Sequence, residues 1–270
     1  GRLIEQPARA VVLSAYALNN VRLLLLSGLG TPYDPVTGAG VVGRNYAHQI
    51  LQTSAGFFAG RRFRSYMGSG TGMQLDDFAN DNFDHTGHGF IGGGQILCLP
   101  QHSLVRGPIL PPGAPRWGAG WQESMATWYD ASVTAAVVGH SLAYRGNHLD
   151  LDPTYKDAWG LPLLRVTFDW RENERRIAGF MRERVDELWR AAGADAAVLP
   201  RLSERFDPAL YQGTHNTGGA VMGADPGSSV VDSALRMWDT DNLWVVGGSA
   251  FPQNGVPGPT GTIGALAYKA

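Results

Sequence analysis

The chain has 270 residues, of which 44% are hydrophobic and 17% are charged, and its formal net charge is −2 at pH 7. These values are typical of a globular protein and exclude a largely disordered chain, and the weak charge with scattered Lys and Arg gives no electrostatic basis for nucleic-acid binding. The single cysteine excludes an intramolecular disulfide framework and a cysteine-based zinc site, and no apolar run reaches the roughly 18 residues that a membrane span needs.

Glycine is the exception in this composition. The chain has 36 glycines, which cluster without the strict period of collagen. Clustered glycines predict tight turns, or backbone that lies close to a flat or bulky group. The N-terminus has neither an initiating Met nor the basic start and apolar run of a signal peptide, so we expect a processed chain or a fragment of a longer protein.

The first elements predict a strand followed by a helix. Residues 10–16, AVVLSAY, form a continuous apolar run that is typical of a fully buried strand in a parallel sheet. Asn19 and Asn20 offer N-cap side chains for a short helix through VRLLLLSG, which Gly28 and Gly30 would end. Strand, turn and helix form the unit of a nucleotide-binding α/β fold, but many other α/β proteins begin in the same way.

The middle of the chain predicts an irregular region followed by strands and one long helix. From Thr31 to about Gly120 it is rich in Gly, Asp, Asn and Pro, which favour turns and loops. Residues 132–140 and 161–170 predict strands. Residues 171–192 predict an amphipathic helix, because apolar residues recur there at three- and four-residue spacing. That apolar face is expected to pack into the core.

The C-terminal end repeats the opening pattern. LWVVGGS at residues 243–249 predicts a second buried strand, and TIGALAYKA predicts a helix with Pro259 near its first turn. A helix N-terminus after a Gly/Pro loop favours the binding of an anion or a polarised ring at that end of the helix. We therefore expect a nucleotide-fold layer at each end of the chain with an α+β insertion between them.

Two motifs suggest other chemistry. GHSLA at residues 139–143 matches part of the nucleophile elbow of serine hydrolases, which needs strand, Gly-x-Ser-x-Gly and helix. Gly146 and Asp152-Pro153 would break that helix, so Ser141 is expected to be a strand-end hydroxyl. His85 and His88 could ligate a metal, but a glycine-rich loop gives them no shared helical face, which favours a polar turn.

The segment GTHNTGGAVMG at residues 213–223 presents one imidazole, that of His215, among polar residues and glycines. A free imidazole with a pKa near 6.5 can take a proton from an alcohol within hydrogen-bond reach. Spacing alone leaves a catalytic base and a structural loop histidine equally open.

The C-terminal region resembles the glucose–methanol–choline (GMC) oxidoreductases in the order of its motifs. These are THN at residues 214–216, Met-Gly at 222–223, a short acidic turn, NLWVVGGSAFP at 242–252 and PTGTIGALA at 259–267. Upstream, SAYALNNVRLLLLSG and VVGRNYAHQ are similar to the family's strand–helix beside FAD and its following loop. DNFDHTGHGFIGGGQI and LDPTYKDAWGLPLLRVTFDWRENE most resemble the gluconate 2-dehydrogenase large-subunit branch, so the likeness covers nearly the whole chain.

This resemblance implies an α/β plus α+β fold in three segments. Residues 1–50 and 206–270 would be parts of a FAD-binding Rossmann-like domain, and residues 51–205 an inserted substrate-binding domain with an antiparallel sheet. No G-x-G-x-x-G follows an early strand. We therefore expect that the family's N-terminal dinucleotide-binding half is missing from this chain.

The resemblance also implies FAD-dependent oxidation of a CH–OH group in a sugar, polyol or sugar acid. His215 would take the hydroxyl proton, and Asn216 would orient the hydroxyl while hydride passes to the flavin. The family's second catalytic His or Asn aligns with Gly258. Asn254 lies four residues away and is a candidate to replace it.

The cofactor-binding residues implied by the resemblance come from three segments, and no metal is expected. They are Ser14 and Ala15 near the ADP portion, and Gly247, Gly248, Ser249, Gly258, Pro259 and Thr260 against the isoalloxazine and ribityl. Family members often carry an acidic residue at the position of Gly247. It is therefore left open whether this chain makes the contact with the ribityl chain that is usual in the family.

The implied partners are a sugar or sugar-acid substrate and a cytochrome or small subunit that accepts electrons. The likeness further implies a periplasmic or membrane-associated complex, with no membrane span in this chain itself. A non-enzymatic alternative stays open, namely an isolated C-terminal half or degenerate homologue that cannot hold FAD alone.

Overall fold

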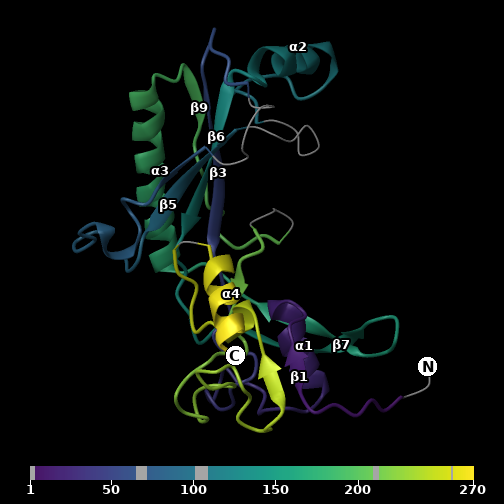
Figure 1. The fold of residues 1–270 in the computed structure, drawn as a ribbon. Coiled ribbons are helices and arrows are strands. Elements are labelled where there is room, and N and C mark those ends of the chain that lie inside the picture. The colour runs from purple at the N-terminus through teal and green to yellow at the C-terminus, as the bar shows by residue number, and fades with distance from the viewer. Residues whose placement is uncertain (1–3, 65–71, 101–108, 209–212, 257) are drawn as a thin grey trace. The chain divides into compact units, whose positions relative to one another are not determined.

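The computed structural model describes residues 4–64, 72–100, 109–208, 213–256 and 258–270 (Figure 1). The chain divides into two compact units. The first unit comprises Gly1–Gln49, Ser141–Asp169 and Thr214–Ala270, and the second comprises Ile50–His140 and Trp170–Gly213. The expected domain of residues 51–205 therefore needs one correction, because Ser141–Asp169 packs with the two chain ends.

The chain ends meet in the first unit through two short strands. Strand β1 (Val11–Leu13) pairs in parallel with β11 (Leu243–Val245), and each of them lies within an apolar run that predicts a strand. The other regular elements of the unit follow in chain order. They are α1 (Ala17–Leu26), β2 (Ala47–His48), β7 (His148–Lys156), β8 (Pro162–Thr167), β10 (Asn216–Thr217), the short 3-10 helix η2 (Gly248–Ala250) and α4 (Thr260–Lys269).

Helix α1 supplies much of the core of this unit. It buries Ala17, Asn20, Val21 and Leu24, which lie on one helical face at three- and four-residue spacing. This face packs against β7, β8 and η2. The buried cluster around it contains Val42, Tyr46, Leu149, Ala220, Val230, Val231, Leu235, Met237, Leu243, Val245 and Ala250.

Two predictions for the first elements are wrong. Strand β1 is not fully buried, because Val11 is 43% and Val12 61% exposed. Within the described residues its sheet has only two strands, so no layer covers these side chains. Helix α1 begins at Ala17, so Asn20 lies one turn inside the helix and does not cap it.

The second unit is built on a five-stranded antiparallel sheet, as expected for the middle of the chain. The strand order is β4 (Met73–Leu75), β5 (Gly94–Pro100), β6 (Ser132–Gly139), β3 (Ile50–Phe57) and β9 (Ala196–Val198). Helix α3 (Glu172–Ala192) lies along this sheet and packs on β3, β5 and β6 (Figure 1). It buries Ile177, Met181, Val185 and Trp189, which confirms the predicted apolar face.

Several elements of this unit lie where loops were expected. They are β3, β4, β5 and the 3-10 helix η1 (Asn80–Asn82), and helix α2 (Gly118–Trp128) begins at the end of that region. Strand β3 was missed because it buries polar residues: Gln52 is 4% and Ser54 0% exposed. Burial of such side chains breaks the alternation of apolar and polar residues by which strands are recognised.

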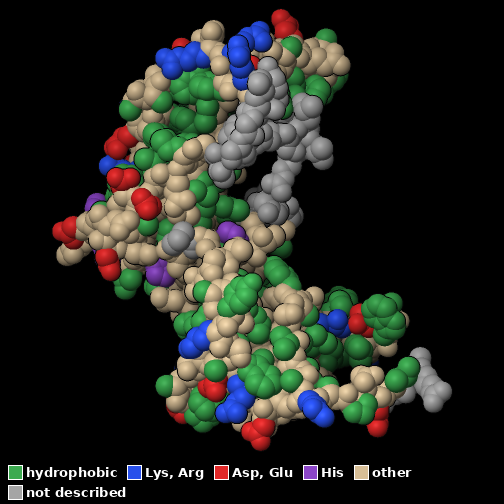
Figure 2. Space-filling model, viewed as in Figure 1, with side chains coloured by type: hydrophobic (Ala, Val, Ile, Leu, Met, Phe, Trp, Pro, Cys, Tyr) green, Lys and Arg blue, Asp and Glu red, His purple; other side chains and the backbone are tan. Residues whose placement is uncertain are grey.

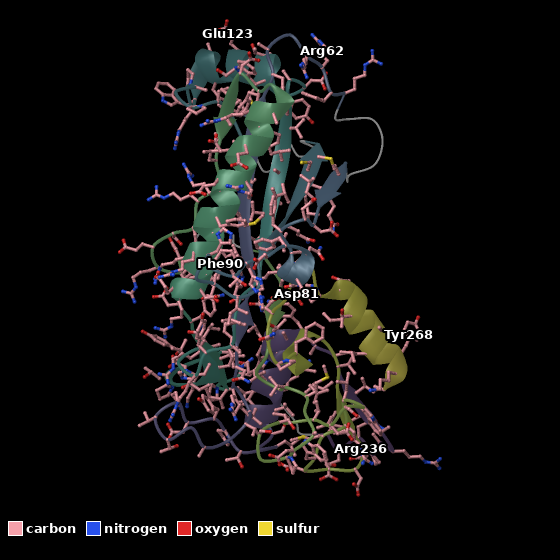
Figure 3. All side chains as sticks on the ribbon, turned by 90° about the vertical axis from the view of Figure 1, so that its left-hand side faces the viewer. Arg62, Asp81, Phe90, Glu123, Arg236 and Tyr268 are labelled. Atoms are coloured by element: carbon pink, nitrogen blue, oxygen red, sulfur yellow. The ribbon has the colours of Figure 1, made fainter. Side chains whose placement is uncertain are left out.

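The surface of the first unit exposes several apolar side chains. Figure 2 shows them gathered over the β7–β8 hairpin, where the exposed residues are Tyr155, Trp159, Leu161, Leu163 and Val166. At the end of α4, Tyr268 points outward and is 97% exposed (Figure 3). None of the described helices combines the length and apolar character that crossing a bilayer requires.

Candidate active site

A cavity of about 350 Å³ lies in the first unit, where three parts of the chain come together. These are the turn between β1 and α1, the loop that leads into β10, and the segment from β11 to the first turn of α4. The lining residues are Ser14, Tyr16, Ala17, Thr214, His215, Asn216, Val246, Gly247, Gly248, Pro259, Thr260 and Ile263.

The cavity brings together most of the residues that the sequence singled out. Those in its lining are Ser14, His215, Asn216, Gly247, Gly248, Pro259 and Thr260. Ala15, Ser249, Asn254 and Gly258 are absent from that lining. Each of these four nevertheless lies next to a lining residue or holds one in place, as the contacts below describe.

The glycines around the cavity allow backbone to lie directly on backbone. Gly218 has φ 83°, and a Cβ there would be 2.0 Å from the carbonyl oxygen of Asn45. A Cβ at Gly248 would be 2.5 Å from the carbonyl oxygen of Asn216. Any side chain at either position would push the β10 segment away from its neighbours. The glycine clusters are therefore explained by close packing of the loop that carries His215.

The His215 imidazole is held by a glutamine that the sequence did not single out. His215 Nδ1 lies 2.5 Å from Oε1 of Gln49, whose Nε2 donates to the carbonyl oxygen of Gly255, also at 2.5 Å. Partial burial lowers the pKa of His215 below its ordinary value of 6.5. The imidazole is therefore neutral at physiological pH, which is the state that can accept a proton.

Asn254 contacts the backbone of the loop that carries His215. Its side chain is buried, and its Nδ2 donates a 2.7 Å hydrogen bond to the carbonyl oxygen of His215. Its backbone exchanges hydrogen bonds with Ser141 in an antiparallel bridge. Asn254 thus holds the backbone at His215 through its Nδ2, and it is absent from the lining of the cavity.

Gly258 borders the imidazole itself. A Cβ at this position would lie 3.2 Å from Cε1 and 3.8 Å from Nε2 of His215. Gly258 is therefore adjacent to the His215 ring, and as a glycine it brings no functional group there.

Asn216 lines the cavity, but its amide is already occupied. Its Oδ1 accepts a 2.5 Å hydrogen bond from the hydroxyl of Tyr46, and its Nδ2 donates to the hydroxyl of Tyr16 and to the carbonyl of Thr214. Burial raises the pKa of the Tyr46 hydroxyl, which therefore remains a proton donor. Asn216 is better placed to fix the loop and Tyr16 than to orient a substrate hydroxyl.

Tyr16 has a backbone conformation that is unusual for a residue with a side chain. Its φ is 81° and its ψ 149°, a region that glycine ordinarily occupies. Tyr16 lines the cavity wall, and the residue as a whole is 46% exposed. The sequence gives no local signal for it, because the strain is held by contacts between distant segments.

Asn20 is a second residue whose role sequence reasoning missed. It is fully buried, and its Nδ2 donates to the carbonyl oxygen of Val246 and the hydroxyl of Ser249, both at 3.0 Å. Its Oδ1 accepts from the backbone N–H of Ala15 at 2.7 Å. Asn20 therefore ties the β1–α1 turn to the segment after β11, and Ala15 and Ser249 support the cavity as its partners.

The two other motifs have structural roles. Ser141 is buried, and the strand β7 follows it where a nucleophile elbow would need a helix. His85 and His88 lie against the ring of Phe83. Among the residues that the structure describes, no group of three or more metal-ligating side chains forms a cluster.

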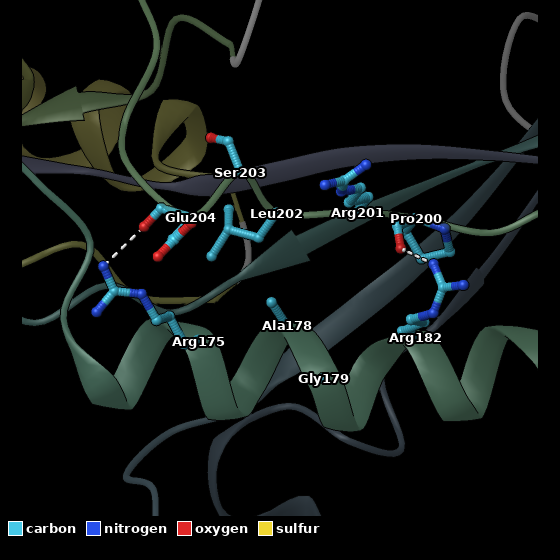
Figure 4. A pocket seen from close by; sticks show the side chains of 9 residues that line it. All are labelled: Arg175, Ala178, Gly179, Arg182, Pro200, Arg201, Leu202, Ser203 and Glu204. Carbon is cyan, nitrogen blue, oxygen red and sulfur yellow. Dashed lines mark hydrogen bonds between the residues drawn. The ribbon is translucent and has the colours of Figure 1, made fainter.

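A larger cavity, of about 590 Å³, lies in the second unit between α3 and residues 200–204 (Figure 4). Arg175 donates to the carbonyl of Glu204 and Arg182 to that of Pro200, so these guanidinium groups fasten the segment to the helix (Figure 4). Its lining has no histidine or cysteine, and it contains none of the candidate site residues that the sequence singled out. We therefore take the smaller cavity at His215 as the candidate active site.

The chain is similar to known oxidoreductases. The family model described as GMC oxidoreductase matches residues 143–267. The gluconate 2-dehydrogenase flavoprotein of Pantoea cypripedii is 42% identical over 273 residues, which cover 99% of this chain and 44% of that protein. The fructose dehydrogenase large subunit of Gluconobacter japonicus is 36% identical over 124 residues, which cover 46% of this chain and 22% of that protein.

A solved structure shares the fold. Pyridoxine 4-oxidase from Mesorbium loti superposes with a TM-score of 0.56 at 19% identity, covering 96% of this chain and 50% of that one. The chain therefore spans about half the length of this protein and less than half that of the gluconate 2-dehydrogenase flavoprotein.

Proposed function

Because this chain belongs to the GMC oxidoreductase family, we propose that it forms the C-terminal part of a FAD-dependent dehydrogenase that oxidises a CH–OH group. The observation that carries this proposal is the cavity at His215. There a neutral imidazole lies beside a glycine-lined wall and the first turn of a helix. These are the parts that alcohol oxidation with a flat, electron-accepting ring requires.

The residues of the cavity fit a flavin. Gly247 has φ 120° and carries no side chain, and the backbone at Gly248 is packed too tightly to accept one. Pro259 and Thr260 open α4, whose N-terminal N–H groups favour negative charge. When bound, FAD supplies the acceptor for the hydride that leaves the carbinol carbon. Ser14, Gly247, Gly248, Pro259 and Thr260 would hold it, with Ala15, Ser249 and Gly258 behind them.

His215 would act as the general base. A neutral alcohol is a far poorer hydride donor than an alkoxide, so removal of the hydroxyl proton by the imidazole promotes the oxidation. The lowered pKa of His215 supports this role, because it keeps the ring neutral at physiological pH. Asn254 supports it indirectly by holding the His215 backbone.

The substrate class and partners are inferred from the relatives. A sugar, polyol or sugar acid is proposed as the substrate, because the most extensive of the matches described above is named a gluconate 2-dehydrogenase flavoprotein. The names "flavoprotein" and "large subunit" support a small subunit or cytochrome that accepts the electrons. By the same reasoning we propose a periplasmic or membrane-associated complex.

The exposed valines of β1 favour one qualification of this proposal. Val11 and Val12 are apolar strand residues that nothing in the described chain covers. We propose that further chain packs on them in the complete protein, and that the present segment alone does not retain FAD.

The test uses the complete protein and the present segment side by side. We expect the complete protein to carry flavin absorbance that gluconate or a related polyol bleaches under anaerobic conditions, and the segment to carry none. A complete protein without flavin would refute the dehydrogenase proposal. If the segment retained flavin, only the proposal that the segment alone does not hold FAD would be refuted.

A further inference from the structure

We infer that Gln49 is a positioning residue that fixes the hydrogen of the neutral His215 ring on Nδ1, so that Nε2 is the atom that accepts the substrate proton. The inference about the tautomer stands on the structure of the loop, and the statement about the substrate proton rests on the proposed function. Neither the sequence motifs nor the family likeness singled out Gln49.

The direction of the hydrogen bonds follows from the chemistry of the three groups. The carbonyl oxygen of Gly255 can only accept, so the side-chain atom of Gln49 at 2.5 Å from it must be the amide nitrogen. This places Oε1 of Gln49 at 2.5 Å from His215 Nδ1. Because Oε1 can only accept, Nδ1 must carry the hydrogen. A neutral imidazole has one ring hydrogen, so Nε2 keeps its lone pair.

Gln49 is itself held rigidly. Its side chain is 1% exposed, and its backbone N–H donates to the carbonyl oxygen of His215 at 3.2 Å. It directly follows β2, whose antiparallel partner β10 directly follows His215, with His48 opposite Asn216. The two residues are therefore brought together by strand pairing, and Gln49 contacts both the backbone and the ring of His215.

An amide at this position has a different effect from a carboxylate. A carboxylate opposite Nδ1–H would stabilise the imidazolium and raise the pKa of the histidine. The amide of Gln49 fixes the tautomer without adding charge. Burial can then keep the pKa of His215 low, so that the base stays unprotonated to lower pH.

The other edge of the ring is left open by Gly258. A Cβ at this position would lie 3.2 Å from Cε1 and 3.8 Å from Nε2 of His215. The absence of a side chain there gives a small group access to the Nε2 edge. Within the described part of the chain, Nε2 makes no hydrogen bond, whereas Nδ1 is bound to Gln49.

The test compares Gln49→Leu and Gln49→Glu with the wild type in the complete flavoprotein. Long-range ¹H–¹⁵N spectra of ¹⁵N-histidine-labelled protein report which ring nitrogen carries the hydrogen, independently of activity. We expect the Nδ1–H form for the wild type and a loss of that preference for Gln49→Leu. For Gln49→Glu we expect the pKa of His215 to rise by about one unit or more.

The pH dependence of flavin reduction provides the second measurement. In Gln49→Glu, the pH at which the rate falls on the acid side should move upward with the pKa of His215, because the base must be neutral to act. Gln49→Leu should lower the rate without that movement. The control is Gln52→Leu, which removes another buried glutamine, 4% exposed, in β3. It should leave both measurements unchanged.

The outcomes separate this inference from the proposed function. An Nδ1–H preference that persists in Gln49→Leu would overturn the role of Gln49, whatever the activity. If the tautomer changes in the Gln49 variants, the tautomer assignment is upheld. If a variant that lacks the His215 ring nevertheless keeps full activity, Nε2 is not the proton acceptor.

Discussion

A side-chain carbon at Gly258 would lie 3.2 Å from Cε1 of His215, so this glycine borders the proposed catalytic ring directly. We predict that Gly258→Ala lowers the rate of flavin reduction by up to about tenfold, because the imidazole must shift by a few tenths of an ångström to admit a methyl group. Stopped-flow reduction of the complete flavoprotein under anaerobic conditions measures this effect.

The matched control is Gly264→Ala in α4, where a Cβ would meet nothing within 4 Å. This variant should keep the wild-type rate and raise the free energy of unfolding by about 0.5–1 kcal/mol, since alanine is the better helix former. Equal rates for Gly258→Ala and Gly264→Ala would contradict this prediction and show that the ring admits a methyl group at position 258 without loss of activity.

The second prediction concerns Asn254, whose amide holds the carbonyl of His215 at 2.7 Å. Asn254→Ala should lower the free energy of unfolding by about 1–3 kcal/mol, because a buried hydrogen bond is lost. Its rate of flavin reduction should stay well above that of a variant lacking the His215 ring. If Asn254→Ala instead abolished reduction at unchanged stability, Asn254 would be the second catalytic side chain after all.

The third prediction concerns Asn20, which joins the β1–α1 turn to the segment after β11. Asn20→Ala should destabilise the fold by about 1–3 kcal/mol for each buried group that loses its partner. Asn19→Ala is the control, because Asn19 is exposed on the same helix. Denaturant unfolding that gives the two variants equal stability would contradict the bridging role of Asn20.

The fourth prediction concerns pH and His140, a buried residue of the second unit. Burial lowers its pKa below 6.5 in the folded protein, whereas the unfolded chain keeps the ordinary value. As the pH falls from 6.5 toward the lowered pKa, the unfolded state binds a proton that the folded state does not. Stability is therefore full above pH 6.5 and decreases below it.

Urea unfolding of the wild type and of His140→Gln at several pH values on both sides of 6.5 measures this effect. The variant should lose less stability on acidification than the wild type. Identical pH dependence in the two proteins would mean that His140 does not contribute.

Local patterns in the sequence predict the elements that depend on local physics. Helix α3 follows from its three- and four-residue apolar spacing, and α4 follows from the Gly/Pro loop and Pro259 at its start. The loop of His215 stands out because its glycines have no helical or strand period. These features can be read from residues that are close together in the chain.

The remaining features depend on contacts between distant segments. Gln49 and His215 are separated by 166 positions, and Asn20 and Val246 by 226, so no local spacing reveals either pair. The burial of β1 was predicted wrongly. An apolar run shows that a strand is suited to burial, but whether its side chains are buried depends on how many other layers of the protein pack against it. The positive φ of Tyr16 is likewise imposed by its surroundings.

The central claim is that the His215 imidazole is the base for alcohol oxidation at a flavin. Anaerobic stopped-flow reduction of the complete flavoprotein by its best sugar or sugar-acid substrate tests it most directly. His215→Ala should lower the limiting rate of flavin reduction by about 10²–10⁴-fold while flavin content and thermal stability stay close to those of the wild type. A variant that is reduced as fast as the wild type would contradict the claim.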